Sequence, residues 1–248
     1  MNSDRLYSTG EVTEDFSFND RVAEVFDDML DRSVPYYRAV ISTTAAMIRE
    51  LAEPGSRVVD LGCATGSTLL ELSRLLADMD LRFIGLDNAP AMLDKARRKA
   101  EMFGKGAVIE FRRRDITAPA LCADIGGADI LLCNYTMQFI RPIRRQEFTR
   151  QLHSALSPGG ALFLSEKIIS SHSRLNRKFI SLYHIFKREQ GYTELEIAAK
   201  REALENVLIP FTVQENMELL TGCGFSEVEL FFRWINFASF VALKSQQQ

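Results

Sequence analysis

The feature that most constrains the fold is a regular alternation of short apolar runs and longer helical patterns through the middle of the chain. The apolar runs cover residues 57–61, 81–86, 108–113, 128–134 and 161–167, and clear helical patterns cover 67–76 and 90–103. Strands separated by helical segments of about ten or more residues pair in parallel through right-handed crossovers. The alternation therefore predicts a doubly wound parallel sheet with helices on both faces.

The end of the chain departs from this alternation. Two apolar runs, 226–234 and 236–244, lie almost back to back. So short a connection permits only antiparallel pairing. The prediction is an α/β, Rossmann-like, doubly wound sheet of seven strands that ends in an antiparallel hairpin, within one domain that spans residues 1–248.

Two further parts of the chain, each with predicted helices, are expected to lie outside the sheet. Residues 1–17 are polar and form an arm, and an amphipathic stripe starts at Asn19 and stops before Pro35; a second helix, 36–51, ends at a Pro-Gly pair. We expect residues 1–52 to supply an arm and lid helices over the ligand crevice. The segment 168–210 is a helical insert after strand five, since Thr193 and Glu196 form a T-x-x-E capping box.

Composition excludes several classes of function. The net charge is −3, which argues against a whole-molecule electrostatic contact with nucleic acid. The four cysteines have no spacing that suits zinc, so we expect reduced thiols and no metal. No apolar run approaches the ~20 residues of a membrane span, and the polar start has no signal-peptide pattern, which predicts a cytoplasmic protein without membrane contact.

The most informative motif is the loop Asp60-Leu61-Gly62-Cys63-Ala64-Thr65-Gly66, which joins a buried strand to a helix. Glycine in such a loop lets the backbone approach a ligand closely. The spacing is G-x-x-x-G, not the G-x-G-x-x-G of dinucleotide sites, and no Lys-Ser or Lys-Thr pair follows to bind phosphates. The loop therefore favours a cofactor that lacks a pyrophosphate.

Polar residues also follow the neighbouring strands. Asp87 and Asn88 end strand two, where a carboxylate can accept both hydroxyls of a ribose. Asp115 and Ile116 follow strand three, where a carboxylate and a backbone N–H can contact an adenine edge. Asn134 ends strand four, and all these strand ends converge on one crevice.

Taken together, these features resemble the class I S-adenosylmethionine-dependent methyltransferases over residues 50–245. Longer blocks narrow the resemblance to the carboxy-S-adenosylmethionine synthase family. The blocks are F-N-D-R-V-A-E-V-F-D-D-M-L-D-R-S-V-P-Y-Y (18–37), Y-T-M-Q-F (135–139), S-P-G-G-A-L-F-L-S-E-K (157–167), F-K-R-E-Q-G-Y-T-E-L-E-I (186–197), K-R-E-A-L-E-N-V (200–207) and N-F-A-S-F-V-A-L-K (236–244). They extend over nearly the whole chain.

The resemblance implies an unusual activity. Members of that family do not transfer the methyl group of S-adenosylmethionine; they carboxylate it, with prephenate as the donor and phenylpyruvate as the second product. The product, carboxy-S-adenosylmethionine, serves a separate enzyme that modifies the wobble uridine of certain tRNAs. The resemblance also implies a homodimer, no metal and no direct contact with nucleic acid.

Ten positions match the ligand contacts of the family. They are Tyr37, Gly62, Cys63, Ala64, Asp87, Asn88, Asp115, Ile116, Asn134 and Arg201. Ala64 stands where the family usually has Ser, so only backbone contacts are expected there. Arg201 is the expected catalytic residue, because a guanidinium can hold the extra carboxylate in a bidentate pair.

Several alternatives remain open at this stage. Arg201 could instead lie on a solvated helix face and pair with Glu205 at i+4. His184 is a candidate base, but an isolated His is more often a core or surface residue. Arg112 to Arg114 and the set Arg141, Arg144 and Arg145 are expected on solvated faces.

The alternative functions are a conventional methyltransferase acting on a small molecule or tRNA, a module that binds S-adenosylmethionine without chemistry, and a nicotinamide-dependent oxidoreductase. The missing third glycine of the loop disfavours the last of these.

Overall fold

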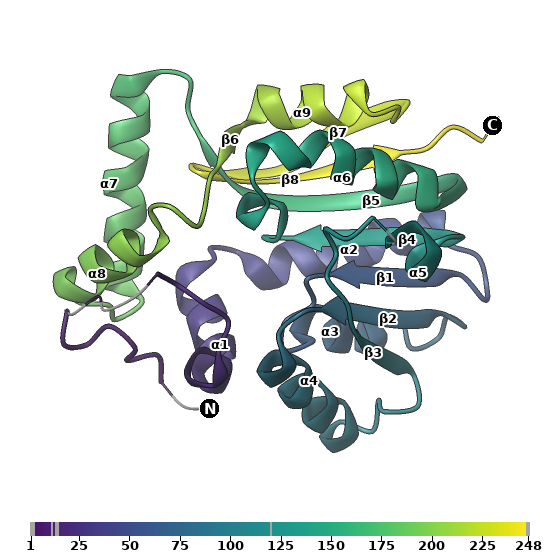
Figure 1. Ribbon diagram of the computed structural model, residues 1–248, viewed down its shortest axis with the longest axis horizontal. Coiled ribbons are helices and arrows are strands. Elements are labelled where there is room, and N and C mark those ends of the chain that lie inside the picture. Colours follow the sequence, from purple (N-terminus) through teal and green to yellow (C-terminus); the bar gives the residue numbers. More distant parts are fainter. Residues whose placement is uncertain (1–2, 11, 13–14, 120, 247–248) are drawn as a thin grey trace.

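A twisted sheet with helices on both faces forms the centre of the protein (Figure 1). The computed structural model describes residues 3–10, 12, 15–119 and 121–246. The strands are β1 (Arg57–Leu61), β2 (Arg82–Asp87), β3 (Ile109–Arg113), β4 (Ala128–Asn134), β5 (Leu156–Ile169), β6 (Phe211–Thr212), β7 (Glu227–Trp234) and β8 (Phe237–Leu243). They follow the order β3-β2-β1-β4-β5-β8-β7, with β6 paired to β5.

The pairing directions confirm the predicted fold class. Strands β1 to β5 pair in parallel, and β8 runs antiparallel to both β5 and β7. The two-residue strand β6 extends the sheet beyond the seven strands that were expected. A strand of two residues is too short to produce an apolar run in the sequence, so β6 was not predicted.

Helices cover the sheet on both sides. They are α1 (Asp20–Ser33), α2 (Tyr37–Leu51), α3 (Ser67–Leu75), α4 (Pro90–Met102), α5 (Leu121–Ile125), the 3-10 helix η1 (Met137–Phe139), α6 (Pro142–Ala155), α7 (Ser173–Glu189), α8 (Glu194–Leu204) and α9 (Val213–Gly222). Side chains alternate between the two faces of each strand. In β1, Val58 packs into the core shared with α2, α3 and α4, whereas Val59 and Leu61 pack into the core shared with α5, α6 and α9.

Two regions differ from the sequence-based expectation. Helix α6 was not predicted, because its apolar stripe is interrupted: Ile143 is 90% exposed and Arg145 is buried. Strand β5 starts at Leu156, ahead of the apolar run 161–167 from which it was predicted, and it includes the Pro158-Gly159-Gly160 segment. The register with β4 shifts there, so the segment forms an irregularity within the strand.

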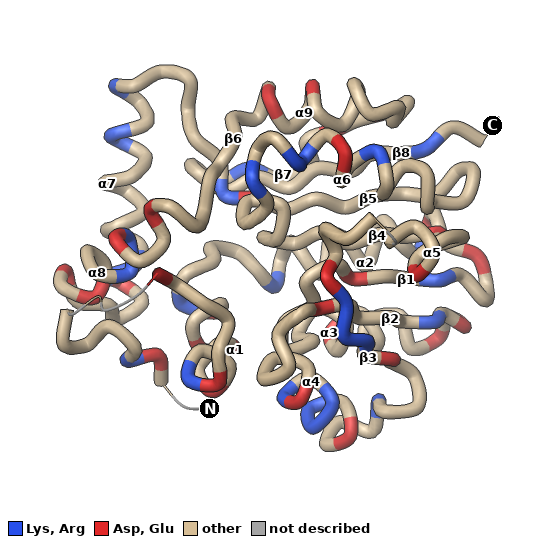
Figure 2. The backbone as a smooth tube through the Cα atoms, in the orientation of Figure 1, with Lys and Arg blue, Asp and Glu red and all other residues tan. Residues whose placement is uncertain are grey.

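The expectation that Arg145 lies on a solvated face is wrong. The guanidinium is buried and donates hydrogen bonds to the backbone oxygens of Ile140, Gln138 and Ile209. It therefore connects α6 to the η1 segment that precedes it and to the segment between α8 and β6. Arg141 and Arg144 are exposed, as expected, and basic and acidic residues are interspersed over the flanking helices (Figure 2).

The helices predicted near the ends of the sheet are present with their caps. Asn19 accepts a hydrogen bond from the backbone of Val22 at the start of α1, and the capping box of Thr193 and Glu196 starts α8. The arm packs against these helices: Phe16 is buried and its N–H donates to Ala203. Helices α1, α7 and α8 therefore stand beyond the carboxyl ends of the parallel strands (Figure 1).

Candidate active site

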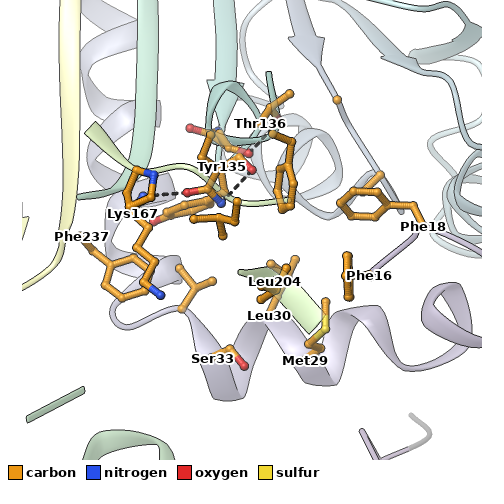
Figure 3. A pocket seen from close by; sticks show the side chains of 18 of the residues that line it. Phe16, Phe18, Met29, Leu30, Ser33, Tyr135, Thr136, Lys167, Leu204 and Phe237 are labelled. Atoms are coloured by element: carbon orange, nitrogen blue, oxygen red, sulfur yellow. Dashed lines mark hydrogen bonds between the residues drawn. The ribbon is translucent and has the colours of Figure 1, made fainter. Parts of the chain in front are cut away.

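A pocket of about 520 Å³ opens where β1 to β5 end and where α1, α7 and α8 face the sheet. This volume lies in the range of small-molecule sites, ~300–1,000 Å³. All ten residues predicted to contact the ligand line it: Tyr37, Gly62, Cys63, Ala64, Asp87, Asn88, Asp115, Ile116, Asn134 and Arg201. Figure 3 shows Met29, Leu30 and Leu204 on one side of this pocket and Tyr135 and Thr136 on the other.

The loop after β1 is held by the acid that ends β2. One carboxylate oxygen of Asp87 accepts a hydrogen bond from the N–H of Ala64, and the other accepts from the N–H of Ala89, both at 2.9 Å. Gly62 has φ +75°, and a Cβ there would lie 2.6 Å from the side chain of Thr136. Position 62 therefore requires glycine, because the backbone there has a positive φ and because a side chain would clash with Thr136.

Asp60 is a lining residue that the sequence-based site did not include. It is 2% exposed, and burial together with the charge of Asp87 raises the pKa of its carboxyl to about 7. A buried acid beside a second acid is disfavoured as an anion unless a positive group lies near it. The position of Asp60 at the end of β1 is the signal that could have identified it.

Helix α1 is fastened to the loop by Asp27. The carboxylate accepts hydrogen bonds from the hydroxyls of Thr65 and Ser67, at 2.6 and 2.7 Å, and from the ammonium of Lys99 at 2.9 Å. Burial raises the pKa of Asp27, but Lys99 and these hydroxyls outweigh it and lower the pKa to about 2. Asp27 therefore stays charged and keeps α1 over the pocket.

Two tyrosines close the pocket near the end of β4. The hydroxyls of Tyr37 and Thr68 are 2.9 Å apart and hydrogen bonded, and burial raises the pKa of Tyr37. The ring of Tyr37 lies 6.4 Å from that of Tyr135, which follows Asn134. The neighbouring Tyr36 is 58% exposed, so the two adjacent tyrosines have different surroundings.

The residues after β3 lie at the edge of the pocket. Asp115 is exposed, and its carboxylate accepts hydrogen bonds from the backbone and the hydroxyl of Thr117, both at 2.8 Å. Ile116 is half-buried beside it. This arrangement keeps the Asp115 carboxylate and the Ile116 backbone together at one side of the opening.

Arg201 reaches the pocket from the last turn of α8. Its side chain is exposed and lines the opening. The alternative i,i+4 ion pair with Glu205 is not formed. Among the described residues, Arg201 therefore has no carboxylate partner within ion-pair distance.

Comparison with known proteins identifies the family. Residues 58–160 match a family model described as a methyltransferase domain. A carboxy-S-adenosyl-L-methionine synthase from Desulfotalea psychrophila is 52% identical over 243 residues, which cover 98% of both chains. The chain belongs to the carboxy-S-adenosyl-L-methionine synthase family. A member from Wolinella succinogenes is 46% identical over 98% of this chain and 99% of its own.

Solved methyltransferase structures have the same fold as this chain. An O-methyltransferase family protein from Burkholderia thailandensis has a TM-score of 0.66 at 18% identity, covering 98% of this chain and 68% of that chain. An S-adenosylmethionine-dependent methyltransferase from Methanosarcina mazei has a TM-score of 0.56 at 20% identity, covering 81% and 98%. A synthase of this family therefore uses the fold of methyltransferases.

Over residues 3–10, 12, 15–119 and 121–246, no helix combines the length and apolar character needed to cross a membrane. Within the same ranges, no group of three or more His, Cys, Asp or Glu side chains is arranged to hold a metal ion.

Proposed function

We propose that this protein converts S-adenosylmethionine and prephenate to carboxy-S-adenosylmethionine and phenylpyruvate. The observation that carries the proposal is the 52% identity with a carboxy-S-adenosyl-L-methionine synthase over 98% of both chains. The pocket supports it, because all ten expected contact residues line one cavity.

The adenosyl group fits the half of the pocket above β1, β2 and β3. Asp87 accepts hydrogen bonds from the ribose hydroxyls, and Asp115 with the Ile116 backbone contacts the adenine edge. The loop at Gly62 lets the ligand approach the backbone. Asp60 faces the positive part of the ligand, and a cation there compensates for the burial of its carboxylate.

The reaction balances without a separate oxidant or metal. Prephenate loses a carboxylate as carbon dioxide, and its ring becomes aromatic as the ring hydroxyl leaves as hydroxide. The hydroxide removes a proton from the methyl group on the positive sulfur, which forms water and an ylide. The ylide carbon then forms the new C–C bond with carbon dioxide. The protein positions both substrates and excludes water from the ylide.

Arg201 is the catalytic residue in this proposal. The carboxylate that forms on the methyl carbon is a new anion beside the sulfonium, and a guanidinium can hold it with two charge-assisted hydrogen bonds. The support is its place at the pocket opening with no ion pair to Glu205. A conventional methyltransferase has no need of this group.

Mass spectrometry tests the reaction directly. We expect the purified protein, incubated with S-adenosylmethionine and prephenate, to release carboxy-S-adenosylmethionine and an equal amount of phenylpyruvate. Omission of prephenate is the control. If a methylated acceptor and S-adenosylhomocysteine form instead, with prephenate intact, the protein is a conventional methyltransferase; if neither reaction occurs, it is a binding module.

The biological role follows from the same proposal. The product is consumed by a separate enzyme that modifies wobble uridine in tRNA, and this protein acts in the cytoplasm without contacting nucleic acid or membranes. The similarity of this chain to the carboxy-S-adenosyl-L-methionine synthases supports this role.

We also propose a homodimer. Helix α7 stands away from the sheet (Figure 1), and Leu175, Leu182 and Ile185 on it are 42–47% exposed. Apolar side chains gathered on one exposed helix mark an interaction surface. Light scattering is expected to give twice the mass of one chain, and a monomeric mass at micromolar concentration would rule the dimer out.

A further inference from the structure

Three lysine side chains come together at the end of the pocket farthest from β3. Lys167 lies at the end of β5, Lys187 in the last turn of α7 and Lys200 in α8. All three line the pocket. They surround two tyrosine rings: the ammonium of Lys167 is 5.2 Å from the centroid of the Tyr183 ring, and that of Lys200 is 5.3 Å from Tyr192.

Lys187 lies over both of these rings. Its ammonium is 5.4 Å from both tyrosine ring centroids. Figure 2 shows basic positions on both α7 and α8, and Figure 3 shows Lys167 beside Phe237 on the wall of the pocket. The three cations therefore come from three separate elements and share one enclosed space.

The described residues supply little negative charge to this cluster. Asp4 pairs with Lys200 at 3.4 Å, and the same ammonium is 3.2 Å from the hydroxyl of Ser33. In the described ranges no carboxylate lies within ion-pair distance of Lys167 or Lys187. Two of the three cations therefore have no acidic partner there.

Keeping these buried ammonium groups charged costs free energy. Lys187 is 6% exposed, and burial together with Lys200 and Lys167 lowers its pKa to about 7. Burial and Lys200 lower the pKa of Lys167 to about 8. Buried ammonium groups without partners destabilise a fold, so packing alone gives no reason for them.

The three lysines lie at the other side of the pocket from the residues proposed to contact adenosine. The ribose and adenine contacts follow β2 and β3, and the sheet order puts β1 and β4 between β2 and β5. Lys167 lies two residues before the end of β5, on the side of the pocket away from β2 and β3. The unpartnered cations thus face the part of the pocket that adenosine leaves free.

We propose that Lys167 and Lys187 form a binding subsite for the carboxylates of prephenate, with Lys200 held in position by Asp4. The inference rests on the proposed function. Prephenate is a dianion, and two ammonium donors match its charge with charge-assisted hydrogen bonds. The enclosing tyrosine rings and Phe237 pack against its ring.

Direct binding tests this subsite. We expect calorimetric titration of prephenate into the S-adenosylhomocysteine-bound protein to show affinity that is about ten- to hundredfold weaker for Lys187→Met and Lys167→Met than for the parent chain. Lys178→Met is the matched control, since Lys178 lies exposed on α7 outside the pocket, and it should bind prephenate normally.

Thermal unfolding of the ligand-free protein separates binding from structure. Because Met removes a buried charge, Lys187→Met should unfold at the same or a higher temperature than the parent. A lower unfolding temperature with unchanged prephenate affinity would assign the lysine to the fold and overturn the subsite. If the parent makes carboxy-S-adenosylmethionine while both Met variants keep its KM for prephenate, this subsite is wrong although the proposed function stands. If the parent makes none, the proposed function itself fails.

Discussion

Replacing Arg201 by Ala is expected to weaken binding of carboxy-S-adenosylmethionine about tenfold and to leave binding of S-adenosylmethionine almost unchanged. The two ligands differ only by the carboxylate that the guanidinium would hold. A hydrogen bond to a charged group contributes ~1.5–3 kcal/mol, and the exposure of Arg201 to solvent points to the lower end of that range. Calorimetric titration of each ligand into each protein measures the difference.

The control for Arg201 is a second exposed arginine. Arg177 on α7 does not line the pocket, so Arg177→Ala should bind both ligands as the parent does. Equal losses for the two ligands in Arg201→Ala would show that the guanidinium contacts the shared part of the ligand or supports the pocket. In either case Arg201 would not be the group that recognises the new carboxylate.

The parts of the fold that follow from local patterns were predictable. The strand at 57–61 and the strand at 128–134 have the bounds expected from their apolar runs, and the capping box of Thr193 and Glu196 starts α8. A strand or a cap depends on residues close together in the chain, so its signal is visible in the sequence. Helix α6 was missed because Arg145, a charged residue in a core position, interrupts its apolar stripe.

The candidate site likewise has one part that local sequence patterns predict and one part that they do not. The positions of Asp87 and Asp115 at the pocket were predicted, because Asp87 ends β2 and Asp115 follows β3, and parallel strands bring their carboxyl ends to one edge. The lysine cluster was not predicted, since Lys167, Lys187 and Lys200 lie in separate elements and each is ordinary in its local pattern. Only the packing of α7 and α8 against β5 brings them together.

The largest effect is expected at Asp87. We predict that Asp87→Asn binds both S-adenosylmethionine and carboxy-S-adenosylmethionine at least about a hundredfold more weakly, since two charge-assisted hydrogen bonds to ribose hydroxyls contribute roughly 3 kcal/mol or more. The same carboxylate holds the N–H groups of Ala64 and Ala89, so the substitution also places an amide N–H₂ against a backbone donor. Loop support and ribose contact must therefore be separated.

A double-mutant cycle with a modified ligand makes that separation. S-adenosylhomocysteine and its 2′-deoxy analogue are titrated into the parent and into Asp87→Asn. If Asp87 contacts the ribose, removal of the hydroxyl weakens binding to the parent but has little further effect in the variant. If the hydroxyl contributes equally to both proteins, the two effects are additive, and Asp87 then acts only through the loop that it holds to the end of β2.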